Sequence, residues 1–365
     1  MNEFGLLGVF DRVSSVSGGS IAAATLALAW DDLAFDETTG VAAGFNQVES
    51  KLLDFAGTRL DARVIATGLV RPGRQIAEQV AAAYRNRLFG DASLQQLPVS
   101  PRFVICASNV GTGSLVRFAR PYTADYRVGC RLEPKTPVST AVAASSAFPP
   151  FLSPLKLELG DEEALTDPFP DKAQGDVEDT ETLFKEPWTH TMYLSDGGVY
   201  DNLGLEPVEA YDTVLVSDGG GPGKLQEKPS RNWFGHVMRS WVNTDQQVRA
   251  RRRTALLDLR DGRRVVGFWA IDTNIEDYPA DGKLPVHQSW IELLATVKTR
   301  LWPPYTEGIG LRTGSSDHLR YRLVNWGYAV CDAAVRSYVL TDQSRPSPPA
   351  WPYAEFSLEL PVPSG

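Results

Sequence analysis

The chain has 365 residues, a formal net charge of −9, and 43% hydrophobic and 22% charged residues. These proportions are those of a globular protein with a large core, and they exclude a disordered or collagen-like chain. No apolar run reaches the ~20 residues of a membrane span, and residues 1–10 lack the pattern of a secretory signal. The three cysteines are widely separated, which argues against a disulfide framework. We expect a cytoplasmic location, unless a segment upstream of Met1 carries a signal.

The first predicted elements are a strand over residues 10–16 and an apolar helix over residues 20–28, joined by a turn of small residues. An abrupt strand-to-helix turn requires small residues, here Ser15, Gly18 and Gly19, and it holds the hydroxyl of Ser17 at the helix N-terminus. There the Gly18 N–H faces the negative charge that develops on a substrate carbonyl. Ser17 is the candidate nucleophile, with Gly18 and Gly19 as oxyanion and elbow residues. On its own, the pattern also fits a plain connector or a phosphate-binding turn.

Strands and helices then alternate along the chain, which predicts an α/β fold with a largely parallel sheet, helices on both faces, and one domain over residues 1–343. Prolines from residue 346 onward predict an irregular tail over residues 344–365 that lies on the surface. The expected helices are residues 46–60, 73–88, 137–147, 203–211, 232–257, 288–301 and 316–339. The expected strands are residues 102–107, 115–119, 155–159, 192–195, 213–216 and 265–271.

The acidic charge gathers in residues 161–186, where ten Asp and Glu residues stand against two lysines. This composition predicts a solvated loop, inserted between two strands. The loop is either a plain surface insertion or a flap at the mouth of an active site, because its downstream end runs into the strand that ends at Asp196. An acidic flap would favour neutral or short esters over anionic lipids.

A carboxylate ends the strand over residues 192–195, because Asp196 is followed by Gly197 and Gly198. The two glycines allow another backbone to approach, and an aspartate at a strand end is well placed to accept a proton. Asp196 is therefore the candidate base, and Gly197 and Gly198 are its supporting residues.

Three motifs together resemble the patatin-like phospholipase family of serine lipid acyl hydrolases. They are the serine elbow at residues 15–19, the segment Ala144-Ser145-Ser146-Ala147-Phe148-Pro149, and the Asp196-Gly197-Gly198 turn, in the order that the family has them. The resemblance implies a three-layer α/β/α fold and a Ser17–Asp196 dyad without histidine. It also implies a lipid or acyl-ester substrate, no cofactor, and a substrate pocket lined by Ser145, Ala147 and Pro149.

One feature of the family does not match. Its members carry a Gly-rich oxyanion loop on a strand well before the nucleophile, and the sixteen residues before Ser17 contain neither that loop nor that first strand. Three explanations stay open: a natural start upstream of Met1, other oxyanion donors, or weak catalysis. The expected function is a carboxylic ester hydrolase working through an acyl-enzyme. The alternative is a catalytically poor binding or scaffold protein with the same fold.

Other candidate sites have weaker patterns. Asp218, followed by three glycines, is the second choice of base, and it does not begin a phosphate-binding loop because Leu225 stands where Ser or Thr is required. A Ser-Asp-His triad would need His236, His287 or His318 on a loop after a strand. No pair of histidines or cysteines has metal-ligand spacing, so we expect no metal.

The basic residues of the predicted helix over residues 232–257 have two interpretations. Arg249 and Arg251 to Arg253 form a single basic run in an acidic chain, which argues against nucleic-acid binding. A solvated helix face is the default. Peripheral contact with an anionic membrane is the alternative. The oligomeric state is not predicted.

Overall fold

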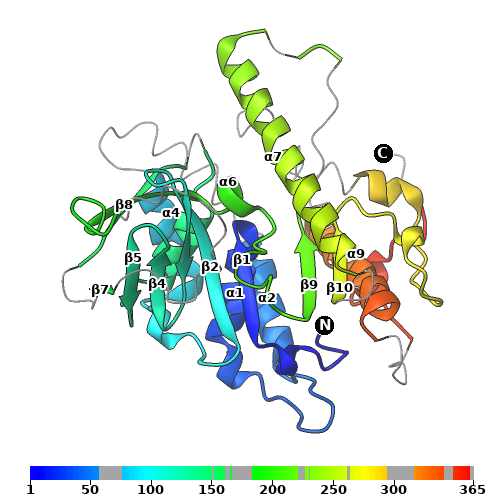
Figure 1. The fold of residues 1–365 in the computed structure, drawn as a ribbon. Helices are drawn as coiled ribbons and strands as arrows, with labels where there is room; N and C mark the ends of the chain where they lie inside the picture. Colours follow the sequence, from blue (N-terminus) through cyan, green and yellow to red (C-terminus); the bar gives the residue numbers. More distant parts are fainter. Residues whose placement is uncertain are drawn as a thin grey trace. The chain divides into compact units, whose positions relative to one another are not determined.

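The computed structural model describes residues 1–56, 76–149, 152–160, 165–166, 183–220, 227–229, 231–260, 264–293, 316–340 and 348–361. The chain divides into two compact units, Asn2–Glu209 and Ala210–Gly365 (Figure 1). The single domain over residues 1–343 therefore stays a prediction. Most of the acidic insertion, residues 161–186, lies outside the described residues, and the predicted flap with it.

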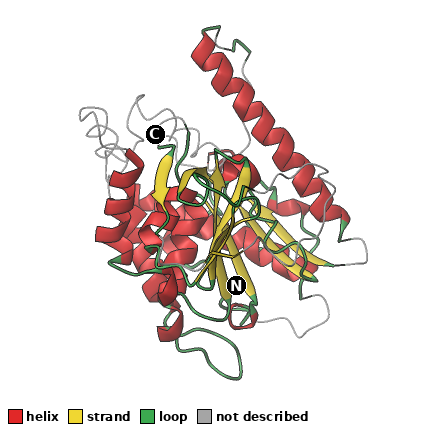
Figure 2. Cartoon of the chain, turned by 60° about the vertical axis from the view of Figure 1, so that its left-hand side comes forward, coloured by secondary structure: helices red, strands yellow, loops and turns green. Residues whose placement is uncertain are grey.

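The first unit is built on one sheet with eight described strands, in the order β6-β8-β2-β3-β4-β5-β7, and β1 pairs with β2. The strands lie side by side in a curled sheet with helices beside it (Figure 2). β4, β5 and β7 were not expected from the sequence. The strands are β1 Arg12–Val16, β2 Arg102–Asn109, β3 Ser114–Phe118, β4 Tyr122–Asp125, β5 Gly129–Leu132, β6 Leu155–Glu158, β7 Leu165–Thr166 and β8 Thr191–Asp196.

The expectation of a largely parallel sheet is wrong for this unit. β1 is parallel to β2, but β2 is antiparallel to both β3 and β8, and the remaining described pairs are antiparallel as well. The physical reason lies in the connections. The turn at residues 110–113 joins β2 to β3 as a hairpin, and a connection this short reverses the chain direction, whereas parallel neighbours need a long crossover.

Helices pack against this sheet. α1 and α5 contact each other and β2, and α4 packs on α5, while the short α6 contacts β2, β3 and β8. α2 contacts α1. The helices are α1 Gly18–Leu28, α2 Phe45–Ala56, α4 Ile76–Tyr84, α5 Val138–Ser145 and α6 Gly198–Asp201, with 3-10 turns at Leu7–Val9, Trp30–Asp32 and Leu94–Gln96 and a π turn at Arg85–Phe89.

The helix expected at residues 203–211 does not form. The carboxylate of Asp201, fully buried, accepts hydrogen bonds from the backbone N–H groups of Leu203, Leu205 and Glu206. A side chain that satisfies these N–H groups offers the backbone an alternative to helical pairing. The segment therefore turns instead of continuing α6.

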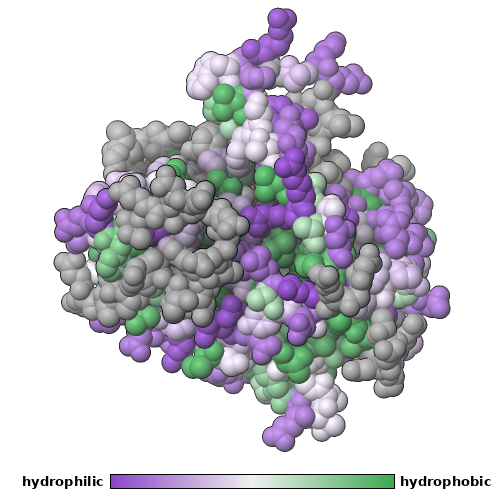
Figure 3. Space-filling model, in the orientation of Figure 1, coloured by the Kyte–Doolittle hydropathy of each residue, from purple (hydrophilic) through white to green (hydrophobic). Residues whose placement is uncertain are grey.

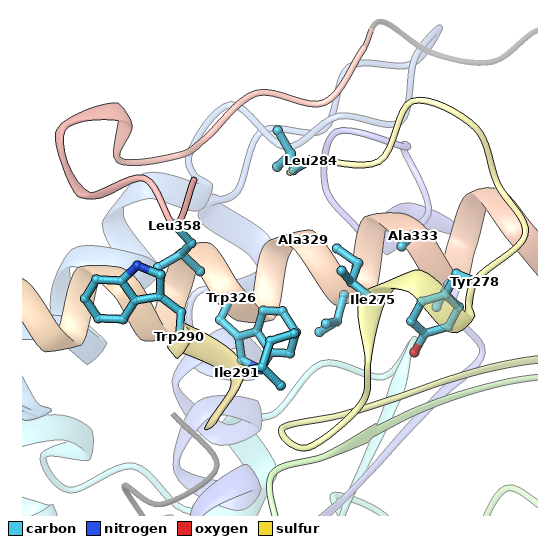
Figure 4. Close-up of a cluster of buried hydrophobic side chains, with 11 residues drawn as sticks. Ile275, Tyr278, Leu284, Trp290, Ile291, Trp326, Ala329, Ala333 and Leu358 are labelled. Carbon is cyan, nitrogen blue, oxygen red and sulfur yellow. The ribbon is translucent and has the colours of Figure 1, made fainter. Parts of the chain in front are cut away.

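The second unit contains a parallel strand pair and two long helices. β9 Thr213–Asp218 lies parallel to β10 Val265–Ala270, and α7 Trp233–Asp258 lies between them in the sequence. α9 Ser316–Tyr338 follows, with 3-10 turns at Ile275–Asp277 and Ala354–Phe356. The core of this unit is a hydrophobic cluster that includes Trp326, Trp290 and Ile275 (Figure 4).

The C-terminal tail is part of that core, which corrects the expectation that it runs over the surface. Leu358 is fully buried in the cluster. The side chain of Asn325 on α9 donates to the carbonyls of Tyr353 and Phe356, at 2.9 Å each, and accepts from the Tyr353 N–H at 3.0 Å. The tail is irregular, as its prolines predict, yet it is held by a buried amide.

Candidate functional site

The predicted elbow at Ser17 is a strained turn between β1 and α1. Ser17 has φ 54° and ψ −129°, and it is one of only three non-glycine residues with positive φ in the described part of the chain. A side chain rarely adopts this conformation, and it persists only where the surroundings enforce it. The Ser17 side chain is half-buried, and the glycines that follow are exposed. The turn thus presents a hydroxyl at the beginning of an eleven-residue helix.

The structure brings Ser17 and Asp196 together. Ser17 Oγ donates a hydrogen bond to Asp196 Oδ2 at 2.7 Å, and the Gly198 N–H donates to Asp196 Oδ1 at 2.7 Å. Asp196 is 3% exposed. The two carboxylate oxygens therefore have different partners. Oδ1 is held in place by the Gly198 N–H, and Oδ2 faces the Ser17 hydroxyl. This is the geometry in which a carboxylate can accept the serine proton.

β2 explains how two residues so far apart in the sequence meet. Val16, at the end of β1, pairs with Cys106, and Asp196, at the end of β8, pairs with Ala107. Both pairs lie on the same edge of β2, because β3 occupies the other edge at these positions. Since Cys106 and Ala107 are consecutive, the C-terminal ends of β1 and β8 meet end to end along this edge. The antiparallel orientation of β8 is what allows its last residue to meet the elbow.

Ser145 lies beneath the elbow and holds it. Its hydroxyl accepts the Ser17 N–H at 3.0 Å and donates to the Cys106 carbonyl at 2.6 Å. The hydroxyl of Ser20 lies 2.8 Å from the Ser145 hydroxyl and 3.0 Å from that of Ser15, to which it donates. Ser145 is fully buried. These contacts join the backbone of Ser17 and Cys106 to the hydroxyl of Ser20. The predicted place of Ser145 in the wall of a substrate pocket is untested.

The same segment also anchors the Asp196 turn. The carbonyl of Ala147 accepts the Asp196 N–H at 2.9 Å, and the carbonyl of Ser145 accepts the Gly197 N–H at 3.0 Å. A Cβ added at Gly197 would lie 2.3 Å from the Cys106 carbonyl oxygen, so this position requires glycine for close packing. Ala147 is buried and Pro149 half-buried. The segment thus supports both the elbow and the aspartate.

The elbow glycines face open space. A Cβ added at Gly18 or Gly19 would meet nothing within 4 Å. Among the described residues, the Gly18 N–H donates to no acceptor. It is the first N–H group of α1, and such groups at a helix N-terminus favour negative charge. Gly18 is placed where an oxyanion donor would be useful, and its role as one stays a prediction.

The rival candidates have other partners. Asp218 ends β9 as predicted, but its Oδ1 accepts the Gly220 N–H at 2.8 Å and lies 3.9 Å from Arg249 Nη1. His236 lies in the first turn of α7 instead of in a loop, and His287 Nδ1 lies 2.8 Å from the Ser289 hydroxyl. His318 is in α9. In the first unit, the hydroxyl of Ser17 donates to a carboxylate and not to an imidazole.

Sequence reasoning missed several supporting residues. Ser20 lies under the elbow, and the Ser108 hydroxyl on β2 donates to the Asp196 carbonyl at 2.8 Å. Burial raises the pKa of the Cys106 thiol to about 12, so this cysteine stays a neutral thiol beside the elbow. Ser20 could have been found from the sequence, because it is a small polar residue directly after the two elbow glycines. Nothing local marked Ser108 or Cys106.

No group of His, Cys, Asp and Glu that could hold a metal ion is found among the described residues. In the same residues, no helix has both the length and the apolar character that a bilayer crossing requires.

Comparison with protein families supports the resemblance. A family model, Patatin-like phospholipase, matches residues 3–208. This is more than half of the chain, and it coincides with the first compact unit, Asn2–Glu209. The chain therefore belongs to the patatin-like phospholipase family, which implies a lipid-hydrolysing enzyme. A comparison with curated proteins found no match.

Proposed function

We propose that this protein cleaves carboxylic esters of lipids with Ser17 as nucleophile and Asp196 as general base. The observation that carries the proposal is the 2.7 Å hydrogen bond from Ser17 Oγ to Asp196 Oδ2 at a strained elbow. A hydroxyl already donating to a buried carboxylate can pass its proton as it attacks, and so never becomes a free alkoxide. Membership of the family supports the lipid class of substrate.

In the first half of the reaction, Ser17 Oγ attacks the carbonyl carbon of the ester while Asp196 Oδ2 takes the hydroxyl proton. The negative charge on the former carbonyl oxygen faces the N-terminus of α1, with the Gly18 N–H as donor. When the tetrahedral intermediate collapses, the bond to the alcohol breaks and Asp196 returns the proton to the alcohol. The acyl group is then an ester of Ser17.

In the second half, water attacks this ester and Asp196 accepts a proton from the water. Collapse releases the fatty acid, and the proton returns to Ser17 Oγ. The hydrogen bond from Gly198 to Asp196 Oδ1 keeps the carboxylate facing the hydroxyl in both halves. Because the same oxygen takes and returns the proton, a histidine has no step to perform.

The test combines covalent labelling and turnover. A fluorophosphonate should label Ser17, Ser17→Ala should abolish labelling, and Asp196→Asn should lower the rate of p-nitrophenyl ester cleavage by about 10²–10⁴-fold. Asp196→Asn keeps the acceptor for the Gly198 N–H, so the turn should stay folded. Ser14→Ala is the matched control on the same strand. The Ser14 hydroxyl lies 3.6 Å from the Cys106 thiol and takes no part in the proposed reaction.

Two results would contradict the proposal. Loss of activity in His236→Ala or His287→Ala with a normal fold would indicate a triad. Wild-type turnover no faster than that of Ser17→Ala would indicate the catalytically poor binding or scaffold protein.

A further inference from the structure

α7 carries an apolar stripe that its own unit does not bury. Leu256 is the one buried residue along this helix of 26 residues. Trp233 is 77% exposed, Val237 55% and Val248 42%, and their spacing places them on one side of the helix. Phe234, 45% exposed, stacks edge-on against Trp233 with ring centroids 5.9 Å apart. We call these four residues the α7 stripe.

Two arginines in the C-terminal half of α7 contact its unit. Arg249 donates to the Gly220 carbonyl at 2.5 Å and pairs with Asp245, and Arg253 lies over the ring of Phe268 on β10. The half of α7 with the lower residue numbers extends beyond β9 and β10 (Figure 1). The most exposed side chains of the stripe are in that half.

Basic residues border the stripe. Arg231 precedes the helix and Arg251 follows Val248 on the same side as Trp233, and both are exposed. In the space-filling view, hydrophilic residues gather at the end of α7 that has the lower residue numbers (Figure 3). Arginines beside Trp, Phe and Val on one helix are typical of helices that lie in a membrane interface. The overall charge of −9 opposes anionic partners, so this local charge has to supply the attraction.

We propose that the α7 stripe docks on the surface of an anionic lipid bilayer, with Trp233, Phe234 and Val237 at the boundary between headgroups and acyl chains. Indole and phenyl rings favour that boundary, and Arg231 and Arg251 meet the headgroup charge. Exposed apolar side chains gain about 25 cal/mol for each Å² removed from water, so contact is favourable without any change of fold. The choice of a bilayer as partner rests on the proposed lipid substrate.

The experiment measures binding apart from hydrolysis. The Ser17→Ala protein, which leaves vesicles intact, is sedimented with vesicles of phosphatidylcholine and phosphatidylglycerol, and in parallel with phosphatidylcholine alone. Trp233→Ser/Val237→Ser should lower the partition coefficient about tenfold, equivalent to ~1.4 kcal/mol. Arg231→Gln/Arg251→Gln should weaken binding to the anionic vesicles only, and added salt should do the same.

The matched control is Val99→Ser/Leu360→Ser, which removes two side chains exposed at 74% and 75% outside α7 and should leave binding unchanged. Equal loss in this control, or binding unchanged in Trp233→Ser/Val237→Ser, would overturn the proposal. Sedimentation velocity gives the other contradictory result. If the wild type is a dimer that Trp233→Ser/Val237→Ser makes monomeric, a second copy covers the stripe.

Failure of this proposal is distinguishable from failure of the proposed function. Cleavage of a soluble p-nitrophenyl ester depends on Ser17 and Asp196 and should be the same in the wild type and in Trp233→Ser/Val237→Ser. A stripe that does not bind vesicles leaves that activity intact. An inactive protein can still bind vesicles.

Discussion

The hydroxyl of Ser145 shows how one atom can hold a strained turn. It accepts from Ser17, donates to the carbonyl of Cys106 and lies 2.8 Å from the hydroxyl of Ser20. A backbone conformation that a serine rarely adopts needs such contacts, because without them the turn relaxes toward an ordinary one. Ser145 thus acts on the proposed chemistry through the orientation of Ser17, as a positioning residue.

Ser145→Ala should slow fluorophosphonate labelling of Ser17 and lower kcat for ester cleavage about tenfold or more, with little change in KM. The variant removes the acceptor of the Ser17 N–H, and an unsatisfied buried group costs about 1–3 kcal/mol, so the thermal midpoint should fall as well. Steady-state kinetics and a melting curve measure both effects.

Ser146→Ala is the control for this prediction. The neighbouring hydroxyl donates to the Val142 carbonyl within α5 and lies 3.2 Å from the Tyr84 hydroxyl, away from the elbow. If Ser146→Ala lowers kcat as much as Ser145→Ala, the effect belongs to the stability of α5 and not to the position of Ser17.

Among the elements, the end of β8 and the beginning of α1 differ in how much space surrounds their glycines. At Gly197, the added Cβ would lie 2.3 Å from a backbone oxygen of β2, whereas at Gly19 it would meet nothing within 4 Å. Close packing of β8 on β2 therefore depends on one missing side chain. The beginning of α1, in contrast, has room for a side chain at Gly19.

Gly197→Ala should destabilise the protein by about 1–3 kcal/mol and displace Asp196, because β2 or β8 has to move to admit the methyl group. Gly19→Ala should keep the stability of the wild type or increase it slightly, since alanine favours helix more than glycine does. Denaturant unfolding monitored by circular dichroism gives the comparison. Equal stabilities of the two variants would show that β8 can shift freely at this position.

At the scale of the whole molecule, the chain divides at the place where the family match ends. The match covers residues 3–208, and the second unit, Ala210–Gly365, has its own core around Trp326. The proposed catalytic residues all belong to the first unit. The stripe proposed to dock on lipid belongs to the second.

Asn325→Ala tests this division. It removes three hydrogen bonds between α9 and the tail, and it should lower the melting midpoint of the second unit by about 2–4 °C for each 1 kcal/mol lost. Differential scanning calorimetry should then show one transition shifted and the other in place. Fluorophosphonate labelling of Ser17 below that transition should continue at the wild-type rate. A single transition that shifts as a whole would show that the two units unfold together.

Local patterns were enough to predict many elements and both proposed catalytic residues. Strands and helices expected at residues 102–107, 213–216, 232–257 and 316–339 were confirmed within a few residues, because hydrophobic periodicity and glycine turns are local signals. The serine elbow and the aspartate at the end of β8 were found in the same way. Their catalytic roles stay predictions.

What the sequence by itself determined was therefore the elbow at Ser17, the strand end at Asp196 and the family they indicate. The tertiary structure decided that the two side chains touch across 179 residues of sequence, that β8 runs antiparallel to β2, and that Ser145 lies beneath the turn. The physical reason is the range of the interactions. A turn depends on its neighbouring residues, whereas strand direction and side-chain contact depend on pairing between distant segments, which no local pattern records.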